Sequence, residues 1–285
     1  MHPCGTSIFQ NRENENHGSS SHRGVLRYWE RDSETLSSKG HIVYGAARRV
    51  EKMQDLAPNG VKPVAMDLNQ DDSMQNAVKT ILQNEEKLDA LINCAGYGSL
   101  GALEDIPLSE ARRQFEVNVF GMARLIQLVL PQMRKQHGGC IVNISSSGGF
   151  FGEPHASWYH AAKYAVEGLS DSLRMELAEF GINVVVIRPG SVVSEWAGIA
   201  VEHFKSVSAN TAYKNTVAHI RMLEKADGKT GIQPIAVAKC VEKSLTAKRP
   251  KPRYTVGADA KLLLFLKGIL SDRMFDRFVL SLIGR

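Results

Sequence analysis

The sequence predicts an α/β fold built on a single doubly wound parallel sheet. From residue 41 onward, short apolar runs alternate with amphipathic segments, which is typical of strand and helix units around a sheet buried on both faces. The chain has 285 residues, of which 43% are hydrophobic and 23% charged, so wholesale disorder is excluded and a large core is possible. We expect one domain with tails.

Six segments have the apolar, β-branched character of strands. In chain order they are H-I-V-Y-G-A-A (41–47), V-K-P-V-A-M-D-L (61–68), L-D-A-L-I-N-C-A-G (88–96), G-C-I-V-N-I-S-S (139–146), I-N-V-V-V-I-R-P-G (182–190) and the short R-Y-T-V-G (253–257). Helices are predicted near 71–86, 109–136, 157–180 and 234–248. Residues 191–230 have few strand signals, and both a lid over a functional site and a poorly ordered connection fit such a segment.

The end of the chain carries helix-spaced apolar residues over 261–283. This stripe could pack on the core or on another subunit, cover a substrate cleft, or contact a membrane surface. Ordinary surface helices carry such a stripe, which favours packing, and interfacial membrane binding is the alternative.

Charge and cysteine usage narrow the class of protein. The net charge of +5 suits an anionic ligand such as a phosphorylated cofactor and is too small to indicate nucleic acid. Cys4, Cys94, Cys140 and Cys240 lie far apart without metal or disulfide spacing, so we expect no metal site and a reducing compartment. No apolar run reaches signal-peptide or membrane-span length, so we expect a cytoplasmic protein without stable membrane insertion.

The segment S-W-Y-H-A-A-K-Y places Tyr159 and Lys163 four residues apart on a predicted helix, hence on one face. A free phenol has a pKa of about 10 and is a poor acid or base at neutral pH. A neighbouring ammonium favours the phenolate, so the pair could exchange a proton with a hydroxyl or carbonyl group. Many solvated helices carry such a pair by chance, so further features must decide.

Three such features stand at strand ends or in a helix. Ser146 ends a predicted buried strand, thirteen residues before Tyr159, at the edge where doubly wound sheets bind ligands. Asn93 and nearby glycines end another strand, as a loop facing a cofactor would require. Ordinary strand-ending turns are the alternative for both. Asn118 lies within an apolar helix, where an Asn is costly unless hydrogen-bonded.

Together these residues resemble the classical short-chain dehydrogenase/reductase family. The resemblance covers about 41–257, with the Asn-x-Ala-Gly loop, the mid-helix Asn, the strand-end Ser and Tyr-x-x-x-Lys in that order. It implies a Rossmann-like catalytic domain over 41–257, an atypical segment at 1–40 and an amphipathic helical extension at 258–285.

The resemblance also implies roles for the catalytic residues. Tyr159 would be the general acid/base, and Ser146 would orient the substrate oxygen. Lys163 would lower the pKa of the phenol and bind the nicotinamide ribose. Asn118 would hold a helix distortion and a water of the proton relay.

The same resemblance identifies candidate cofactor contacts. R-P-G-S-V-V-S is similar to the segment around the nicotinamide carboxamide, so Val192 and Ser194 are candidates, with a simple turn as the alternative. Asp67 matches the position that contacts the adenine. After the strand at 41–47, where an acidic residue would bind the NAD ribose, this chain has Arg48 and Arg49. Arginines there would pair with the 2′-phosphate of NADP. The cofactor-binding residues are therefore Arg48, Asp67, Asn93, Tyr159, Lys163, Val192 and Ser194.

One element of the family is missing. A strand feeding Thr-Gly-x-x-x-Gly-x-Gly should precede the strand at 41–47, because its glycines let the backbone approach a pyrophosphate. The stretch S-S-H-R-G-V-L-R-Y-W-E-R (20–31) occupies that place. One allowed encoding of residues 22–31, read one base later, gives Thr-Gly-Ala-Ser-Ser-Gly-Ile-Gly-Lys. We therefore hypothesise a frame disturbance around residues 20–36; a basic-aromatic nucleic-acid patch is the rival reading.

These observations predict an oxidoreductase that transfers a hydride between NADP(H), or alternatively NAD(H), and a small-molecule alcohol or carbonyl substrate. A homo-oligomer is compatible with the resemblance, and no nucleic-acid partner is expected. The alternative is a non-catalytic Rossmann-like protein that has lost dinucleotide binding through its altered N-terminus. A peripheral membrane enzyme for lipid-like substrates is a third reading, resting on 261–283 alone.

Overall fold

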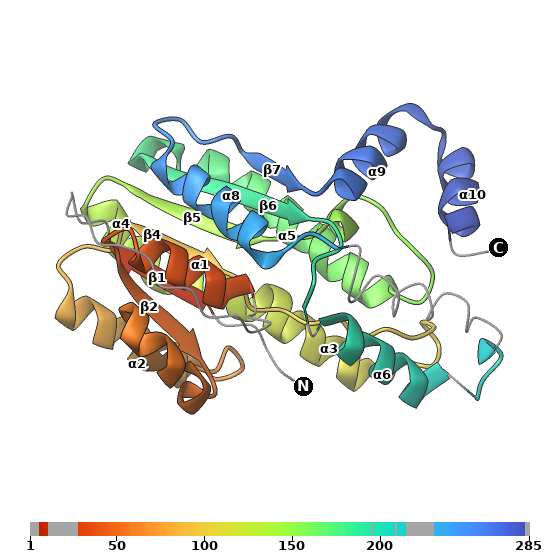
Figure 1. Cartoon of the computed structure of the whole chain (residues 1–285), viewed down its shortest axis with the longest axis horizontal. Helices are drawn as coiled ribbons and strands as arrows, with labels where there is room; N and C mark the ends of the chain where they lie inside the picture. The colour runs from red at the N-terminus through yellow and green to blue at the C-terminus, as the bar shows by residue number, and fades with distance from the viewer. Residues whose placement is uncertain (1–5, 11–27, 195, 209, 215–230, 283–285) are drawn as a thin grey trace.

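A computed structural model of the chain describes residues 6–10, 28–194, 196–208, 210–214 and 231–282. These residues form a seven-stranded sheet in the order β3-β2-β1-β4-β5-β6-β7, with helices on both faces (Figure 1). The predicted α/β class is confirmed.

All six predicted strands are present. They are β2 (Ile42–Ala47), β3 (Val61–Ala65), β4 (Ala90–Asn93), β5 (Gly139–Ile144), β6 (Ile182–Pro189) and β7 (Arg253–Val256). Neighbours among these six pair in parallel, from β2 with β3 and from β4 through β7. Their carboxyl ends therefore share one edge of the sheet, the edge at which ligands of such folds bind.

The centre of the sheet differs from the sequence prediction, which placed no strand before residue 41. The strand β1 (Thr6–Gln10) lies between β2 and β4 and runs antiparallel to both. Ser7 lies opposite Gly45 and Ile92. Gln10 pairs with Ile42, the first residue of β2, so β1 ends at the edge away from the carboxyl end of β4. A glycine loop leaving a parallel first strand at the carboxyl edge is not formed by β1.

Helices cover the two faces as separate layers. One core cluster joins β-sheet side chains to α2 (Asp71–Asn84), α4 (Met122–Lys135) and α5 (Ser157–Glu176). The other cluster joins the opposite face to α1 (Tyr28–Ser37), the 3-10 helix η1 (Val50–Asn59) and α8 (Pro234–Thr246). Neither α1 nor η1 was predicted from the sequence. The helix predicted at 109–136 is a continuous run of α3 (Leu108–Phe115), the π-helical η2 (Glu116–Gly121) and α4.

The segment 191–230 contains α6 (Trp196–Ser208), whereas residues 215–230 lie outside the described residues. The C-terminal stripe forms two helices, α9 (Ala258–Ile269) and α10 (Asp272–Leu282). Phe275 and Val279 of α10 pack with Phe151 in the β5–α5 connection. One face of this extension therefore packs on the domain, which is the role that the sequence analysis preferred for the apolar stripe at 261–283. The opening stretch is described only from residue 28, at the start of α1.

Candidate active site

Tyr159 and Lys163 lie on the first turns of α5, beside the carboxyl end of β5. The buried Lys163 Nζ donates a hydrogen bond to the carbonyl oxygen of Ile144 at 3.0 Å. Its Nζ also lies 5.8 Å from the centroid of the Tyr159 ring. The last residue of β5 therefore holds the ammonium on the same helix face as the phenol, as the four-residue spacing predicts.

The Tyr159 ring is confined by two glycines and an indole. A Cβ added at Gly98 or at Gly148 would lie 3.3 Å from a carbon of the Tyr159 ring. The rings of Tyr159 and Trp196 have centroids 5.1 Å apart at an angle of 52°. A Cβ at Gly98 would also lie 2.5 Å from Trp196. These contacts hold the Tyr159 phenol in one position, as acid–base catalysis requires.

Ser146 follows β5 and is half-buried. Its Oγ accepts a hydrogen bond from the Gly148 N–H at 3.1 Å and so caps the short 3-10 turn η3 (Ser147–Gly149). A hydroxyl carries one donor and two acceptor positions, so this contact leaves the Ser146 proton to be donated elsewhere. The turn that Ser146 caps brings Gly148 against Tyr159.

Asn118 lies in the π-helical turn η2 and is buried. Its Oδ1 accepts from the Tyr97 N–H at 3.0 Å, and its Nδ2 donates to the Tyr97 carbonyl oxygen at 2.8 Å. A Cβ added at Gly96 would lie 3.3 Å from Asn118 Oδ1 and 3.6 Å from Lys163 Nζ. The polar mid-helix residue thus ties the loop after β4 to the helix and brings it beside Lys163.

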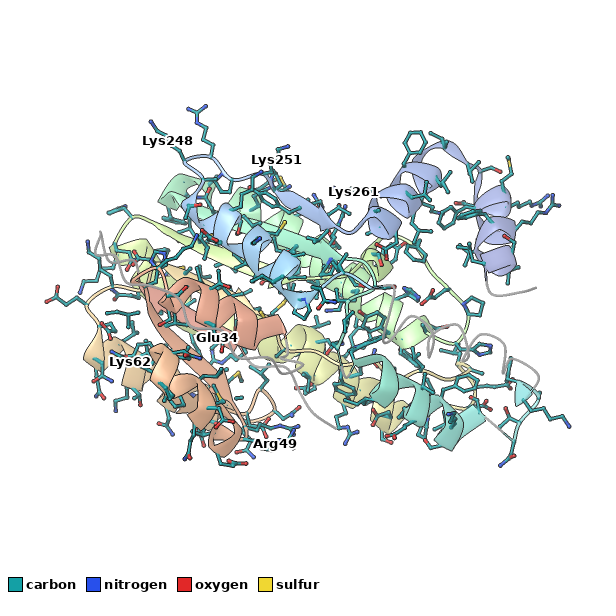
Figure 2. The ribbon with its side chains drawn as sticks, in the orientation of Figure 1. Glu34, Arg49, Lys62, Lys248, Lys251 and Lys261 are labelled. Carbon is teal, nitrogen blue, oxygen red and sulfur yellow. The ribbon has the colours of Figure 1, made fainter. Side chains whose placement is uncertain are left out.

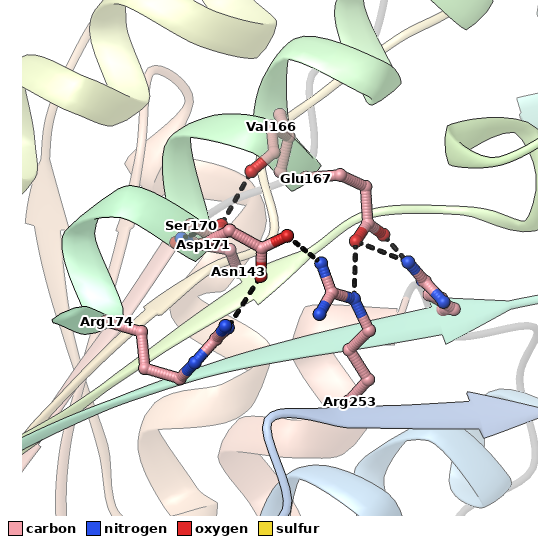
Figure 3. A network of polar contacts seen from close by, with 8 residues as sticks. Asn143, Val166, Glu167, Ser170, Asp171, Arg174 and Arg253 are labelled. Atoms are coloured by element: carbon pink, nitrogen blue, oxygen red, sulfur yellow. Dashed lines mark hydrogen bonds and ion pairs between the residues drawn. The ribbon is translucent and has the colours of Figure 1, made fainter.

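Asn93 is the first residue in a buried series of side-chain hydrogen bonds that crosses from β4 through β5 to α5. Its Nδ2 donates to Asn143 Oδ1 at 2.9 Å, and Asn143 Nδ2 donates to Ser170 Oγ at 3.0 Å. Ser170 in turn donates to the Val166 carbonyl oxygen at 2.6 Å (Figure 3). Asn93 Oδ1 is buried and has no hydrogen-bond partner among the described residues. An unsatisfied buried acceptor at the carboxyl end of a strand fits the donor of a bound ligand.

Asp67 and Arg48 lie at the carboxyl ends of the neighbouring strands β3 and β2. Asp67 Oδ1 accepts from the backbone and side-chain N–H groups of Asn69, both at 3.0 Å. Arg48 is exposed, and Arg49 precedes η1. The side chains predicted to select the nucleotide therefore share an edge of the sheet with Asn93.

Val192 and Ser194 lie between β6 and α6. Val192 is buried and forms an isolated parallel bridge with Ile232. Ser194 Oγ accepts from the Trp196 N–H at 3.3 Å, which satisfies a free donor at the start of α6. In this structure Val192 pairs with the backbone of Ile232, and Ser194 binds the first turn of the helix that carries Trp196.

His160 is a site residue that the sequence analysis missed. It is buried, and its Nδ1 lies 2.9 Å from the Gly148 carbonyl oxygen. Its Nε2 accepts from the Glu153 N–H at 3.1 Å. A neutral imidazole with its proton on Nδ1 satisfies both contacts. His160 therefore fastens both ends of the 148–153 loop to the helix turn that holds Tyr159.

An ionic network around the buried Glu167 anchors α5 to the last two strands. Glu167 is buried and accepts two hydrogen bonds from Arg188 of β6, both at 2.7 Å, and one from Arg253 of β7 at 3.0 Å. Arg253 also pairs with Asp171, which binds Arg174 at 2.6 Å (Figure 3). The Arg253 guanidinium holds the pKa of the Asp171 carboxyl below its usual range. Planar guanidinium groups suit such bidentate pairing.

The helix α6 builds an apolar wall beside the phenol. The buried cluster there contains Leu100, Ala156, Ala200, Val201 and Phe204, with Tyr159 and Trp196 packed against it. The His155 ring meets the Phe204 ring edge-on at 5.2 Å. His155 has a φ of 64°, a left-handed conformation that is uncommon for a residue other than glycine and is often retained near functional sites.

The arrangement can transfer a proton to or from an oxygen placed near Tyr159, beside a hydroxyl donor and a fixed cation. The nicotinamide end of a dinucleotide fits the residues present, because Lys163 and the unsatisfied Asn93 Oδ1 lie at adjacent strand ends. For the pyrophosphate end, the sequence has no Thr-Gly-x-x-x-Gly-x-Gly loop before β2. Among the described residues, no group of three or more His, Cys, Asp or Glu could hold a metal ion, and no helix is long and apolar enough to cross a bilayer.

Comparisons with known proteins bear on the family and the fold of the chain. A family model described as short chain dehydrogenase matches residues 32–203. Oxidoreductase BOA17 of Botryotinia fuckeliana is 35% identical over 233 residues, covering 80% of this chain and 84% of that protein. A 3-ketodihydrosphingosine reductase of Bacteroides thetaiotaomicron is 32% identical over 86% of this chain and 89% of its own length. The crystal structure of a short-chain dehydrogenase from Streptomyces avermitilis superposes with a TM-score of 0.72 at 30% identity, covering 85% of this chain and 87% of that one.

Proposed function

The chain belongs to the short-chain dehydrogenase family, and from this premise we propose that it interconverts an alcohol and a carbonyl compound with NADP(H), or alternatively NAD(H), as the hydride carrier. The observation that carries the proposal is the placement of Lys163 beside the Tyr159 ring by the Ile144 carbonyl. A phenol and an ammonium fixed on one helix face at a strand end can perform acid–base chemistry on an oxygen.

The proton steps follow from the residues present. In the direction of reduction, Tyr159 gives its proton to the substrate oxygen. A reduced nicotinamide held beside Lys163 and Asn93 would supply the hydride for the substrate carbon. Lys163 favours the phenolate that Tyr159 becomes. Ser146, whose Oγ already accepts from Gly148, donates its own proton to the same oxygen and orients it. In oxidation the proton returns to Tyr159.

The remaining residues position these groups. Asn118 fixes the loop after β4 through its two bonds to Tyr97, and His160 fixes the loop after β5. The apolar wall of α6 excludes water from one side of the phenol and suits an apolar portion of the substrate.

The preference for NADP is supported by Arg48. It follows β2 directly, is exposed, and lies beside the strand that leads to Asp67. A guanidinium at this position can form two hydrogen bonds to a 2′-phosphate, which NAD lacks.

The chain as written also supports a second candidate, a member that does not bind dinucleotide. The antiparallel direction of β1 and the missing glycines both remove backbone donors from the place of the pyrophosphate. The family match begins at residue 32, directly after the opening stretch. The frame hypothesis is tested by the nucleotide sequence, since codons for residues 20–31 that give no glycines one base later would exclude it.

Energy transfer from tryptophan to NADPH separates the two candidates. We expect the chain as written to bind weakly and a version with Thr-Gly-Ala-Ser-Ser-Gly-Ile-Gly-Lys in place of residues 22–31 to bind tightly and to reduce carbonyl compounds. Tyr159→Phe in the restored version should bind NADPH without turnover. Tight binding by both versions would contradict our account of the N-terminus, and binding without turnover in the restored version would contradict the proposed reaction.

A further inference from the structure

The outward face of α9 is apolar. Leu262, Phe265 and Ile269 are 53%, 63% and 61% exposed. Their spacing of three and four residues places them on one side of the helix. A surface helix normally presents polar residues to solvent, so this face has the reverse of the usual pattern.

The opposite face of α9 is also apolar and packs on the domain. Ala260 is fully buried. Leu263, Leu266 and Leu270 pack against the cluster of Phe151, Phe275 and Val279. The helix is therefore apolar on both sides while only one side is covered by described residues, and the exposed stripe needs a second apolar environment.

Positive charge is concentrated in the part of the sequence that contains α9. Residues 247–285 contain nine Lys or Arg and three Asp, a balance of +6, while the whole chain carries +5. Figure 2 shows Lys248, Lys251 and Lys261 along one edge of the molecule, over the α8–β7 connection and the start of α9. All three are exposed.

The carboxylates of this segment do little to cancel the charge on that edge. Asp272 pairs with Lys267 at 2.7 Å. Asp259 accepts a hydrogen bond from the Ser191 N–H at 2.8 Å. The third, Asp276, is exposed on α10 and acts on Lys267. None of the three carboxylates pairs with Lys248 or Lys251 among the described residues, and Lys261 directly precedes Leu262 of the apolar stripe.

We infer that this face, formed by Leu262, Phe265 and Ile269 with Lys248, Lys251 and Lys261, docks on the surface of an anionic phospholipid bilayer. Apolar side chains would enter the boundary between headgroups and acyl chains, and the lysines would meet the lipid phosphates and carboxylates. The charge distribution selects this occupant. A second copy paired through the same patch would bring like charges together, and three exposed side chains make a small area for a stable dimer.

Docking through α9 would also place the bilayer near the candidate active site. The cluster under α9 includes Phe151, and the partly buried Phe150 packs against it. Both follow the turn capped by Ser146. The inference does not depend on the reaction proposed above, because vesicle binding is measured without turnover.

The test is sedimentation of the full chain with vesicles. We expect binding to vesicles of phosphatidylcholine and phosphatidylserine in a ratio of roughly two to one, weak binding to phosphatidylcholine alone, and weakening by salt. The combined change Leu262→Gln, Phe265→Gln and Ile269→Gln should lower binding by at least about tenfold. A matched control changes three exposed apolar residues elsewhere, Leu103, Leu108 and Met175, to Gln and should bind like the unchanged chain.

A second variant tests the charges without touching the apolar stripe. Lys248→Gln, Lys251→Gln and Lys261→Gln should each lower binding to the anionic vesicles by about fivefold, with an unchanged melting temperature. Failure of the unchanged chain to sediment with anionic vesicles would overturn the inference. So would equal binding by the stripe variant and its control, or a dimer in light scattering that the stripe variant abolishes.

Discussion

The imidazole of His160 lies so close to the backbone of Gly148 that position 148 has no room for a side chain. Nδ1 lies 2.9 Å from the Gly148 carbonyl oxygen, and a Cβ on Gly148 would lie 2.8 Å from the same nitrogen. The same Cβ would meet the Tyr159 ring at 3.3 Å. The residue that follows the proposed acid/base thus fixes the loop that faces it.

Gly148→Ala is expected to lower turnover by at least about tenfold and to destabilise the fold by about 1–3 kcal/mol, because the buried loop must shift away from two rings. Gly152→Ala lies in the same loop, where an added Cβ meets nothing within 4 Å, and should leave both quantities nearly unchanged. Both substitutions are made in the restored version, and their turnover and their stability to urea are measured. Equal effects of the two substitutions would show that the close contact is unimportant.

The two tyrosines nearest the loop after β4 should behave differently. Burial raises the pKa of the Tyr97 phenol to about 12, so it stays protonated at any working pH and is a poor proton exchanger. We expect Tyr159→Phe to lower kcat by about 10²–10⁴-fold, and Tyr97→Phe to keep the shape of the pH profile. Profiles of kcat/KM for both variants decide the assignment. A lost ionisation in Tyr97→Phe would transfer the role to Tyr97.

Asp171 should make stability depend on acid pH. Its pKa is lowered by the hydrogen bond from Arg253, so the folded state binds fewer protons there than the unfolded state does. The pair therefore stabilises the fold above the ordinary Asp value of about 3.9, and this contribution is lost as the pH falls through the lowered folded pKa. Asp171→Asn should lower the Tm at pH 7. It should have little effect at a pH well below the lowered pKa of Asp171 in the folded state.

Glu176→Gln is the control for that measurement, since Glu176 is exposed on the same helix. It should change the Tm little at either pH. A constant destabilisation by Asp171→Asn across the acid range would mean that packing, and not charge, is what the substitution removes.

Arg48→Asp should reverse the coenzyme preference. The side chain is exposed, so the change is not expected to disturb the core, and we predict at least about a tenfold loss in NADPH affinity with improved NADH binding. Lys79→Asp on α2 makes the same change of charge at an exposed position away from the strand ends. If both variants weaken NADPH equally, long-range charge explains the effect and Arg48 makes no direct contact.

The strands and the Tyr159–Lys163 pair could be predicted because their signals are local. Buried parallel strands read as continuous apolar runs, and a spacing of four fixes a shared helix face. Asn118 was also readable, since an amide in an apolar helix needs partners, and the structure supplies both from Tyr97.

Other features depend on contacts that no local pattern reveals. His160 is adjacent to Tyr159 in sequence, but its role depends on the fold of the 148–153 loop. Trp196 reaches the phenol only because α6 turns back over it. The strand β1 has five residues in a segment rich in Asn, Ser and Gly, and its position is decided by the gap between β2 and β4.

The central position of β1 makes the start of the chain important for assembly. Ser7 pairs with Gly45 and with Ile92, so this short segment joins two parts of the sheet that are distant in sequence, and non-local pairing of this kind slows folding. Without it, β2 and β4 would each present unpaired backbone groups in the middle of the molecule, a template for other chains. Loss of the first ten residues should therefore lead to aggregation before any question of catalysis arises.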